Sequence, residues 1–219
     1  MNFDILEKSI PKECLRAYLE KGTRYDNRGF NDSRKFHFSN NNILKSFDKS
    51  AIGSLGQNKV LLVLKEIGLN YEKNNPIKEI KVENFAKDKS SKNIDAFIHG
   101  LINKNIIYSS ENNKNSYILY ITIQSIDGNI FEVIAKSLSK FFSKDFNTGL
   151  VFSKNFISKT FCFIEGKILL DPIIQEVEQA DYVTNIVKFE DNKYFLFKIS
   201  GGSITINLLQ TALETNFSE

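Results

Sequence analysis

The stretch GTRYDNRGFNDSR, from Gly22 to Arg34, holds three arginines and two aspartates among glycine and asparagine residues. Glycine and asparagine are typical of turns, so we expect an irregular, charged connection here. Guanidinium groups stay charged and match the geometry of phosphate oxygens, so Arg24, Arg28 and Arg34 could contact a polyphosphate backbone. The alternative is a solvated loop whose charges pair with one another and contribute little to stability. The spacing of the arginines bears on this choice.

That spacing resembles the opening motif of the RNase PH family, usually written R-x-D-G-R. Arg24, Asp26 and Arg28 form the pattern R-x-D-x-R, and Arg34 follows six residues later. A motif this short is only moderately specific by itself, so the resemblance depends on whether other family blocks follow in the same order.

Further blocks follow in the family order and cover nearly the whole chain. SAIGSLGQNKV at 50–60 is similar to the family's G-S-A-x-x-x-L-G-N-T-x-V. YILYITIQSIDGNIFE at 117–132 resembles a central hairpin and helix start, and FCFIEGKILLDPIIQEVE at 161–178 resembles a block ending in D-P-T-x-x-E-E. Gly201 and Gly202 match a late G-G before the final helix. The last three blocks are those of the family's exosome branch.

Composition and charge are those of an ordinary globular domain. The chain has 219 residues and a net charge of +3, so any contact with nucleic acid must come from local clusters of charge. Cys14 and Cys162 have no metal-ligand spacing, so we expect two buried free thiols. No apolar run approaches the ~18 residues of a membrane span, and no signal-like succession opens the chain. We expect no contact with a membrane and a location in the nucleus, including the nucleolus, and the cytoplasm.

Local patterns predict alternating helices and strands. A helix over about 8–21 should begin near Pro11 and end at Gly22, the usual helix C-terminal residue. The expected strands are 35–38, 43–52, 60–67, 117–126 and three or four more after 149, with turns at 165–166 and 190–193; the expected helices are 95–105, 130–142 and 205–214; and 70–76 and 87–92 are expected loops.

The resemblance implies an α+β fold with the RNase PH core. In this core a mixed sheet is packed with helices, as in the ribosomal protein S5 domain 2-like β-α-β-α folds. We expect a single RNase PH-like domain over 1–219, since no linker long enough to separate two cores occurs. The segment 73–92 should be shorter than in relatives.

The motifs also imply that the phosphate site of the active family members is missing. Active relatives read D-G-G-T-R, where threonine and arginine bind the attacking phosphate. Here Asp127 and Gly128 are followed by Asn129, Ile130 and Phe131. Isoleucine and phenylalanine side chains neither donate hydrogen bonds nor carry charge, so turnover should be lost.

A second catalytic block is also degenerate. Active relatives carry D-x-x-Y-x-E-D, with the first and last aspartates in acid or metal roles. Asp171 and Glu176 remain, but Ile174 and Val177 replace the tyrosine and the last aspartate. We therefore expect no enzymatic activity, no cofactor and no metal, and for Asp171 the role of a strand-end cap or an interface ion pair.

Histidines and phenylalanines supply no better candidates. His37 and His99 have no partner at ligand spacing, so we expect outward or satisfied side chains at the surface. The nineteen phenylalanines, with no tryptophan, could stack on bases, but most should pack in the core or at a subunit interface.

A retained scaffold with erased catalytic residues resembles the non-catalytic ring subunits of the eukaryotic RNA exosome, in the branch of the archaeal partner subunit. In that assembly six RNase PH-like chains form a ring, cap proteins with S1 or KH domains lie on it, and a hydrolytic nuclease lies below. The ring threads single-stranded RNA for 3'-5' degradation and for processing, including that of rRNA. The sequence does not choose a ring position.

In this interpretation four basic residues are candidates for RNA contact, or for ion pairs with a neighbouring subunit: Arg24, Arg28, Arg34 and Lys35. Two alternatives remain open. The chain could be an active phosphorolytic 3'-5' exoribonuclease subunit, or an RNA-binding or scaffold module of another particle.

Overall fold

The computed structural model describes residues 11–40, 44, 46–69, 75–85, 91–103, 105–110 and 114–217. Its helices are α2 (Pro11–Glu20), α3 (Ser91–Ile102), α4 (Ile130–Phe141), α5 (Ile174–Gln179) and α6 (Ile206–Phe217), with a 3-10 turn η1 (Lys144–Phe146). Its strands are β1 (Phe36–Ser39), β2 (Lys49–Leu55), β3 (Asn58–Leu69), β4 (Ile77–Asn84), β5 (Ile106–Tyr108), β6 (Asn115–Ser125), β7 (Leu150–Phe152), β8 (Phe156–Ile164), β9 (Lys167–Leu170), β10 (Tyr182–Phe189) and β11 (Tyr194–Gly201).

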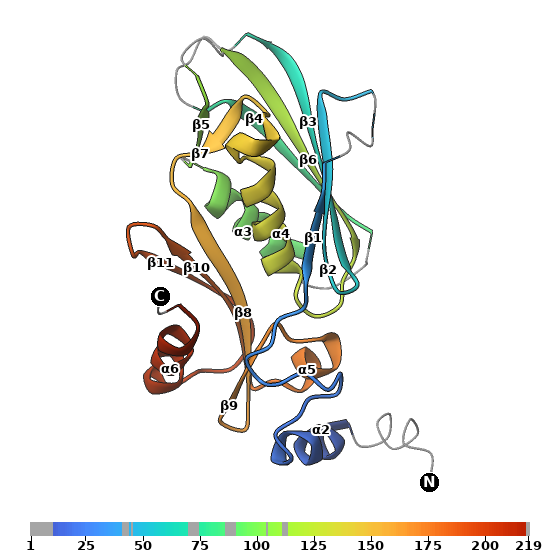
Figure 1. The fold of residues 1–219 in the computed structure, drawn as a ribbon, viewed down its shortest axis with the longest axis vertical. Coiled ribbons are helices and arrows are strands. Elements are labelled where there is room, and N and C mark those ends of the chain that lie inside the picture. Colours follow the sequence, from blue (N-terminus) through green and yellow to red (C-terminus); the bar gives the residue numbers. More distant parts are fainter. Residues whose placement is uncertain are drawn as a thin grey trace.

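A five-stranded sheet forms one half of the molecule, in the order β1-β2-β3-β6-β4 (Figure 1). Neighbouring strands are antiparallel except β4, which runs parallel to β6. Helices α3 and α4 cover one face of this sheet. Mixed sheet and helices together are the α+β architecture that the motifs predict.

Helix α4 lies against this sheet because one broad face of it is apolar, while Lys136, Ser139 and Lys140 face away from the core. Asn129 caps its N-terminus by accepting a hydrogen bond from the Glu132 N–H, and nine of its residues are buried. On β2, a Cβ at Gly53 would overlap the Ser137 side chain of the helix. Gly53 therefore permits the close approach of helix and strand.

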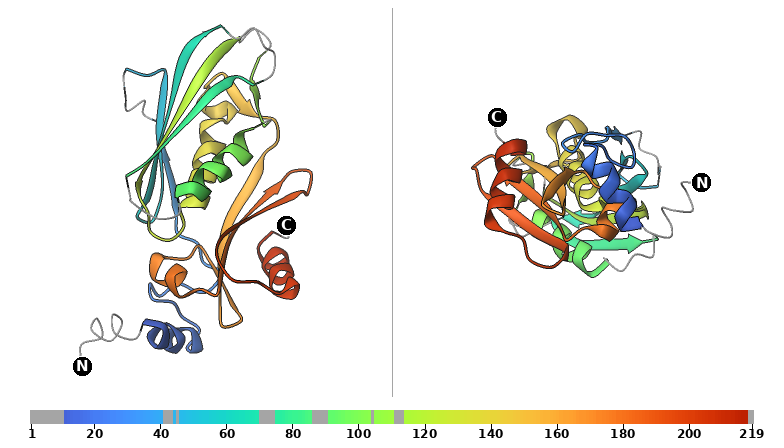
Figure 2. Two further views of the ribbon diagram at one scale, coloured as in Figure 1. Left: turned by 180° about the vertical axis from the view of Figure 1, so that it is seen from behind. Right: turned by 90° about the horizontal axis from the view of Figure 1, so that it is seen from below.

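The second large sheet has the order β11-β10-β8-β9 and is antiparallel throughout. Phe156 of β8 and Val187 of β10 belong to the same apolar cluster as the residues of α3 and α4. The two helices are therefore packed between the two sheets. The far ends of β8 and β10 extend past them and carry α6 on one side and α2 and α5 on the other (Figure 2).

Most of the expected elements are confirmed, and three were missed. Strands β4 and β5 and helix α5 had not been expected, and five strands rather than three or four follow Gly149. Positions 87–90 of the second expected loop lie outside the described residues, and 91–92 begin α3. The single domain over 1–219 stays a prediction. None of the described helices is long and apolar enough to cross a bilayer.

Candidate functional site

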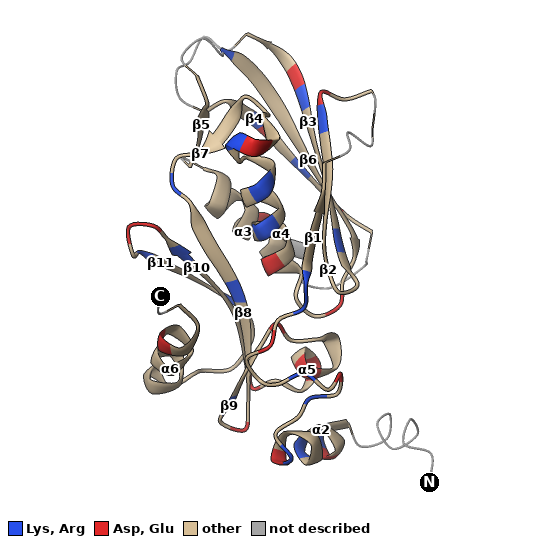
Figure 3. Ribbon diagram, viewed as in Figure 1, with Lys and Arg blue, Asp and Glu red and all other residues tan. Residues whose placement is uncertain are grey.

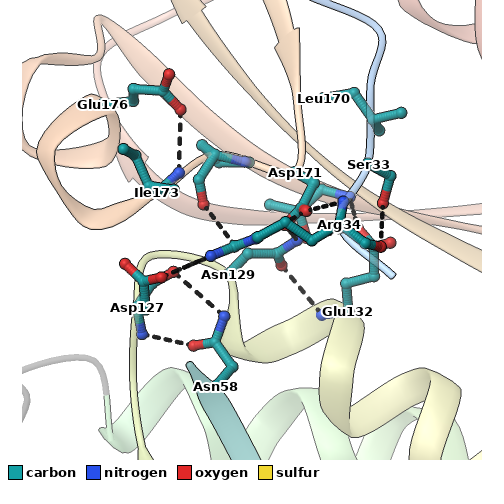
Figure 4. A network of polar contacts seen from close by, with 12 residues as sticks. Ser33, Arg34, Asn58, Asp127, Asn129, Glu132, Leu170, Asp171, Ile173 and Glu176 are labelled. Carbon is teal, nitrogen blue, oxygen red and sulfur yellow. Dashed lines mark hydrogen bonds and ion pairs between the residues drawn. The ribbon is translucent and has the colours of Figure 1, made fainter. Parts of the chain in front are cut away.

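Three chain segments meet where the two halves of the molecule join. They are the loop after α2, the turn between β6 and α4, and the turn between β9 and α5 (Figure 4). Their polar side chains form what we call the arginine network: Arg24, Arg28, Arg34, Asp26, Asp127, Asn129, Asp171 and Glu176. Of the degenerate catalytic positions, Asn129 and Asp171 lie in the second and third segments, Ile130 and Phe131 begin α4, and Val177 lies in α5.

Arg24 is the buried anchor of the network. Its side chain is 0% exposed, and it donates from Nε and Nη2 to the Glu176 carboxylate at 2.8 and 2.5 Å. It also donates to the carbonyl oxygens of Leu170 at 2.7 Å and Asp171 at 3.0 Å. The expectation that Arg24 contacts RNA is therefore wrong, because its donors are directed into the protein. Burial alone would lower the pKa of Arg24, but the hydrogen bonds and charge of Glu176 raise it above its ordinary value.

Arg34 bridges two of the segments. It grips the Asp171 carboxylate with Nε at 2.9 Å and Nη2 at 2.7 Å, and its own backbone N–H donates to the same group at 2.8 Å. Its Nη1 donates to Asp127 at 2.6 Å. Such a fork-to-carboxylate contact is the strongest form of ion pair that arginine makes. Burial alone would lower the pKa of Arg34, but Asp171 and Asp127 together raise it.

Arg28 is the third arginine of the network, and it contacts both Asp171 and Asp26. Its Nη1 lies 3.1 Å from the Asp171 carboxylate, its Nη2 donates to the Asp171 carbonyl at 2.9 Å, and its Nε donates to Asp26 at 2.7 Å. The side chains of Arg28 and Arg34 keep 15% and 13% of their exposure. The alternative of a self-paired loop is thus half right: most of the carboxylates that pair with these arginines come from distant segments.

Asp171 is the centre of these contacts. It is fully buried, it has a positive φ of 52°, and it accepts hydrogen bonds from Arg28, Arg34 and Asn129. Burial alone would raise the pKa of its carboxyl, but the hydrogen bonds and charge of Arg34 hold that pKa below its ordinary value. The sequence analysis expected a strand-end cap or an interface ion pair at Asp171, whereas the ion pairs that the structure shows lie within the chain.

Asn129 and Glu132 extend the network into α4. Asn129 donates from Nδ2 to Asp171 and to Glu132, at 3.0 Å each. Glu132 is 1% exposed and accepts the backbone N–H of Thr160 on β8 at 2.8 Å. One carboxylate therefore ties α4 to the second sheet. The sequence analysis gave Glu132 no role, because a single glutamate in the first turn of a helix is ordinary there.

The β6–α4 turn packs directly against the β9–α5 turn. Gly128 has a φ of +81°, and a Cβ there would lie 2.5 Å from the Ile173 carbonyl carbon and 2.6 Å from the Pro172 oxygen. Asn58 holds the turn by donating to the Asp127 carbonyl at 3.2 Å and accepting from its N–H at 2.5 Å. No side chain other than that of glycine fits at position 128.

The replaced positions contribute to packing. Ile130 and Phe131 are each 1% exposed, and the Phe131 ring lies 5.2 Å from that of Phe97 and 5.4 Å from that of Phe197. Val177 packs in the small apolar cluster that includes Cys162. Three guanidinium groups face four carboxylates in the network, so its excess charge is negative and would repel an inorganic phosphate.

Other candidates lie at the surface. Lys35, His37 and His99 are exposed, and both histidines are where the sequence placed them. Cys162 is a buried free thiol, and burial raises its pKa well above the ordinary value, whereas Cys14 is only half-buried. In the part of the chain that the structure describes, no cluster of His, Cys, Asp and Glu could hold a metal ion.

Comparisons with known proteins give a match in structure and none in sequence. No protein-family model matches the chain, and no curated protein does. An archaeal exosome core chain superposes with a TM-score of 0.69 at 21% identity, over 99% of this chain and 95% of that one. A chain of the Archaeoglobus fulgidus exosome, solved with RNA bound to the active site, superposes with a TM-score of 0.69 at 20% identity, over 95% of this chain and 94% of that one.

Rice (Oryza sativa) Rrp46 gives a TM-score of 0.69 at 19% identity, over 89% of this chain and 92% of that one. These identities are low, but the superpositions span nearly the full length of each chain. The chain therefore has the RNase PH fold that its motifs predict, and shares it with chains of exosome cores.

Proposed function

We propose that this chain is a non-catalytic structural subunit of an RNA exosome ring. Its partners would be other RNase PH-like ring chains, cap proteins with S1 or KH domains and a hydrolytic nuclease, and the ring would pass single-stranded RNA to that nuclease. The support is the shared fold along nearly the whole length of archaeal exosome core chains and of rice Rrp46. RNA processing in the nucleus, nucleolus and cytoplasm belongs to this proposal.

The observation that supports a non-catalytic role is that both carboxylate oxygens of Asp171 are already hydrogen-bonded within the chain. A carboxylate that serves as acid or metal ligand needs a free oxygen facing the reacting group. Both oxygens of Asp171 accept hydrogen bonds from Arg34, Arg28 and Asn129, and the carboxyl is buried. Its low pKa also keeps it ionised, which is the wrong state for a general acid.

The loss of phosphate binding supports the same proposal. Ile130 and Phe131 stand where the resemblance places the phosphate-binding threonine and arginine, and both side chains lie in the apolar core. Arg28 and Arg34, the basic groups nearest this place, already bind carboxylates. No side chain of the network offers a phosphate a cation that is not already paired.

RNA contact remains part of the proposal for Arg28, Arg34 and Lys35. Lys35 is the sharpest test, because it is exposed and its charge can be reversed without breaking the network. If Lys35 meets the RNA backbone, Lys35→Glu should weaken RNA binding by the assembled ring and lower its salt dependence by about one counterion. Unchanged affinity and salt dependence would exclude this contact. Charge reversal at Arg28 would also unpair Asp26 and remove one of the two arginines that pair with Asp171, so it tests stability as well.

Native mass spectrometry of the tagged chain recovered from its own cells tests the ring assignment. Recovery with five other RNase PH-like chains and three cap proteins is the expected result. Recovery alone, as a homo-hexamer, or with unrelated proteins would overturn it. The chain should also behave poorly when separated, because ring subunits bury large interfaces.

A further inference from the structure

The two large sheets have four edges, and the described residues protect three of them. The exposed positions of β4 carry alternating charges at Lys78, Glu79, Lys81 and Glu83. Strand β9 is covered by the loop after α2, where the Leu170 N–H donates to the Phe30 carbonyl at 2.8 Å. Strand β1 has only four residues. Charge, cover and shortness are the usual ways in which an edge is kept from pairing with another chain.

Strand β11 is less protected: it is neither short nor covered by described residues, and its one charged residue is Lys198. It is eight residues long, and among the described residues only β10 pairs with it. Three consecutive apolar residues are exposed at its start: Tyr194 by 46%, Phe195 by 36% and Leu196 by 39%. An edge that is long, apolar and open is an interaction site.

The hairpin fixes which backbone groups of β11 are free. The Phe189 N–H donates to the Lys193 carbonyl at 2.9 Å, so this pair is a hydrogen-bonded one. Hydrogen-bonded and non-bonded pairs alternate in an antiparallel ladder, so Phe195 and Phe197 bond to β10. Tyr194, Leu196 and Lys198 therefore direct their N–H and C=O groups to the open edge.

Lysines outnumber carboxylates beside the edge. No carboxylate occurs from 192 to 213, whereas Lys193 and Lys198 flank the apolar residues. At the Tyr194 end an open hollow is lined by Gly100, Tyr194 and Phe195, by Lys154 and Lys193, and by one acidic residue, Asp191. One carboxylate, that of Asp191, serves both lysines, at 2.7 and 3.2 Å. Within the β10–β11 hairpin, Figure 3 shows acidic residues only in the turn that joins the two strands.

We infer that the open edge of β11 binds an extended segment of a different protein by β-strand addition. The segment alternates apolar and small polar residues and carries carboxylates, one of which meets Lys193 and Lys154 at the hollow. Backbone hydrogen bonds from Tyr194, Leu196 and Lys198 supply affinity, and the lysines supply the preference for acidic partners. A second copy of this chain fits less well, because it would bring two more lysines and no carboxylate to the ribbon.

The test uses the full chain and a fluorescein-labelled peptide of nine residues, in which valine alternates with threonine and a glutamate stands near each end. Fluorescence polarisation should detect binding to the wild-type chain. Leu196→Pro removes a free N–H without breaking a bond to β10, and should weaken binding by about tenfold or more. Leu196→Thr keeps the N–H, so its affinity for the peptide should stay within about threefold of the wild-type value.

Lys193→Glu gives a variant that does not depend on a backbone change, since its side chain is 76% exposed. This variant should bind the glutamate peptide more weakly than wild type does. It should bind the same peptide with lysines in place of the glutamates more tightly. Three results would overturn the inference: no binding by the wild type, equal binding by Leu196→Pro and wild type, or concentration-dependent dimers that Leu196→Pro abolishes. The inference does not require the ring proposal, and the peptide assay reads out without any ring partner.

Discussion

The apolar core between the five-stranded sheet and α4 is buried and the arginine network beside it is partly buried, and the two are held together by different forces. In the core, residues such as Leu62, Ile121 and Phe131 are excluded from water with no polar group to satisfy. In the network, every guanidinium group meets a carboxylate at hydrogen-bond distance. The core tolerates any residue of similar size and polarity, whereas the network depends on complete pairing.

This difference supports a structural role for the network, whereas RNA contact by the partly exposed Arg28 and Arg34 stays a proposal. A site for RNA or phosphate keeps donors unsatisfied until the ligand arrives. Here Arg24, Arg28 and Arg34 join the N-terminal loop to the β9–α5 turn, and Arg34 also holds the turn before α4. The charged motif that resembles an RNA-facing loop fastens three segments of one chain.

The largest expected effect comes from breaking the most buried pair. Arg24→Ala leaves Glu176 buried without its partner, and should lower the free energy of unfolding by ~3–5 kcal/mol in urea denaturation. The matched double variant Arg24→Met with Glu176→Leu removes both charges and should recover much of this loss. A loss below about 1 kcal/mol for Arg24→Ala would contradict the account, because exposed pairs behave in that way.

Asp171→Asn keeps the shape of the side chain and removes its charge. Arg28 and Arg34 then face a neutral amide, and one hydrogen-bond acceptor becomes a donor. We expect a loss of ~2–3 kcal/mol in the free energy of unfolding, less than for Arg24 because the arginines keep Asp26 and Asp127 as partners. Urea unfolding of the variant beside wild type measures this, and an unchanged midpoint would mean that Asp171 is not the centre of the network.

Gly128→Ala tests the close contact of the two turns. The added Cβ meets backbone atoms of Pro172 and Ile173 and must adopt a positive φ, so we expect a loss of ~2 kcal/mol. Gly22→Ala is the control: it has a φ of +75° but no atom within 4 Å of the added Cβ. If thermal unfolding shows equal losses for the two variants, conformation alone is responsible and the turns are not tightly packed.

The pH dependence of stability should separate the network from the core. The folded pKa of Asp171 lies below its unfolded value of 3.8, so its contribution is complete above 3.8 and is lost as the pH falls through the folded pKa. Asp26 has a pKa lowered in the same direction: burial alone would raise it, and hydrogen bonding and the charge of Arg28 outweigh that effect. The free energy of unfolding, measured from pH 5 downward, should therefore decrease more steeply with falling pH for wild type than for Asp171→Asn. Parallel curves would contradict this assignment.

The smallest expected effect is at the surface. Asp191 is exposed and pairs with Lys154 and Lys193, whose side chains are mostly in solvent. Asp191→Asn should leave the urea midpoint unchanged within error, since such pairs contribute little. A clear loss would show that surface pairing is as important in this protein as buried pairing.

The sequence predicts the apolar half of the molecule well, because its signals are local. The apolar stripe of α4 and the turn at Gly128 can be read within a few residues, whereas the cap at Asn129 was not predicted. The missed strand β4 has the alternation Ile77, Ile80, Val82, but its many charges concealed it between two expected loops.

The network could not be predicted in the same way, because its contacts are distant in sequence. Arg24 and Glu176 are 152 residues apart, and Arg34 and Asp171 are 137 apart. The motif identified the arginines as important but gave no sign of whether they face solvent or protein. Burial decides that, and burial depends on the tertiary structure.

Phosphate-dependent degradation of RNA tests the central claim most directly. The purified full chain would be incubated with 5′-labelled single-stranded RNA and inorganic phosphate, alone and with the ring partners with which it is recovered, beside an active phosphorolytic RNase as control. The account expects the chain alone to release no nucleoside diphosphate above background, and any release by the ring to be unchanged by Asp171→Asn. Phosphate-dependent release by the chain alone would contradict it, and so would release by the ring that is lost in an Asp171→Asn variant that still folds and assembles.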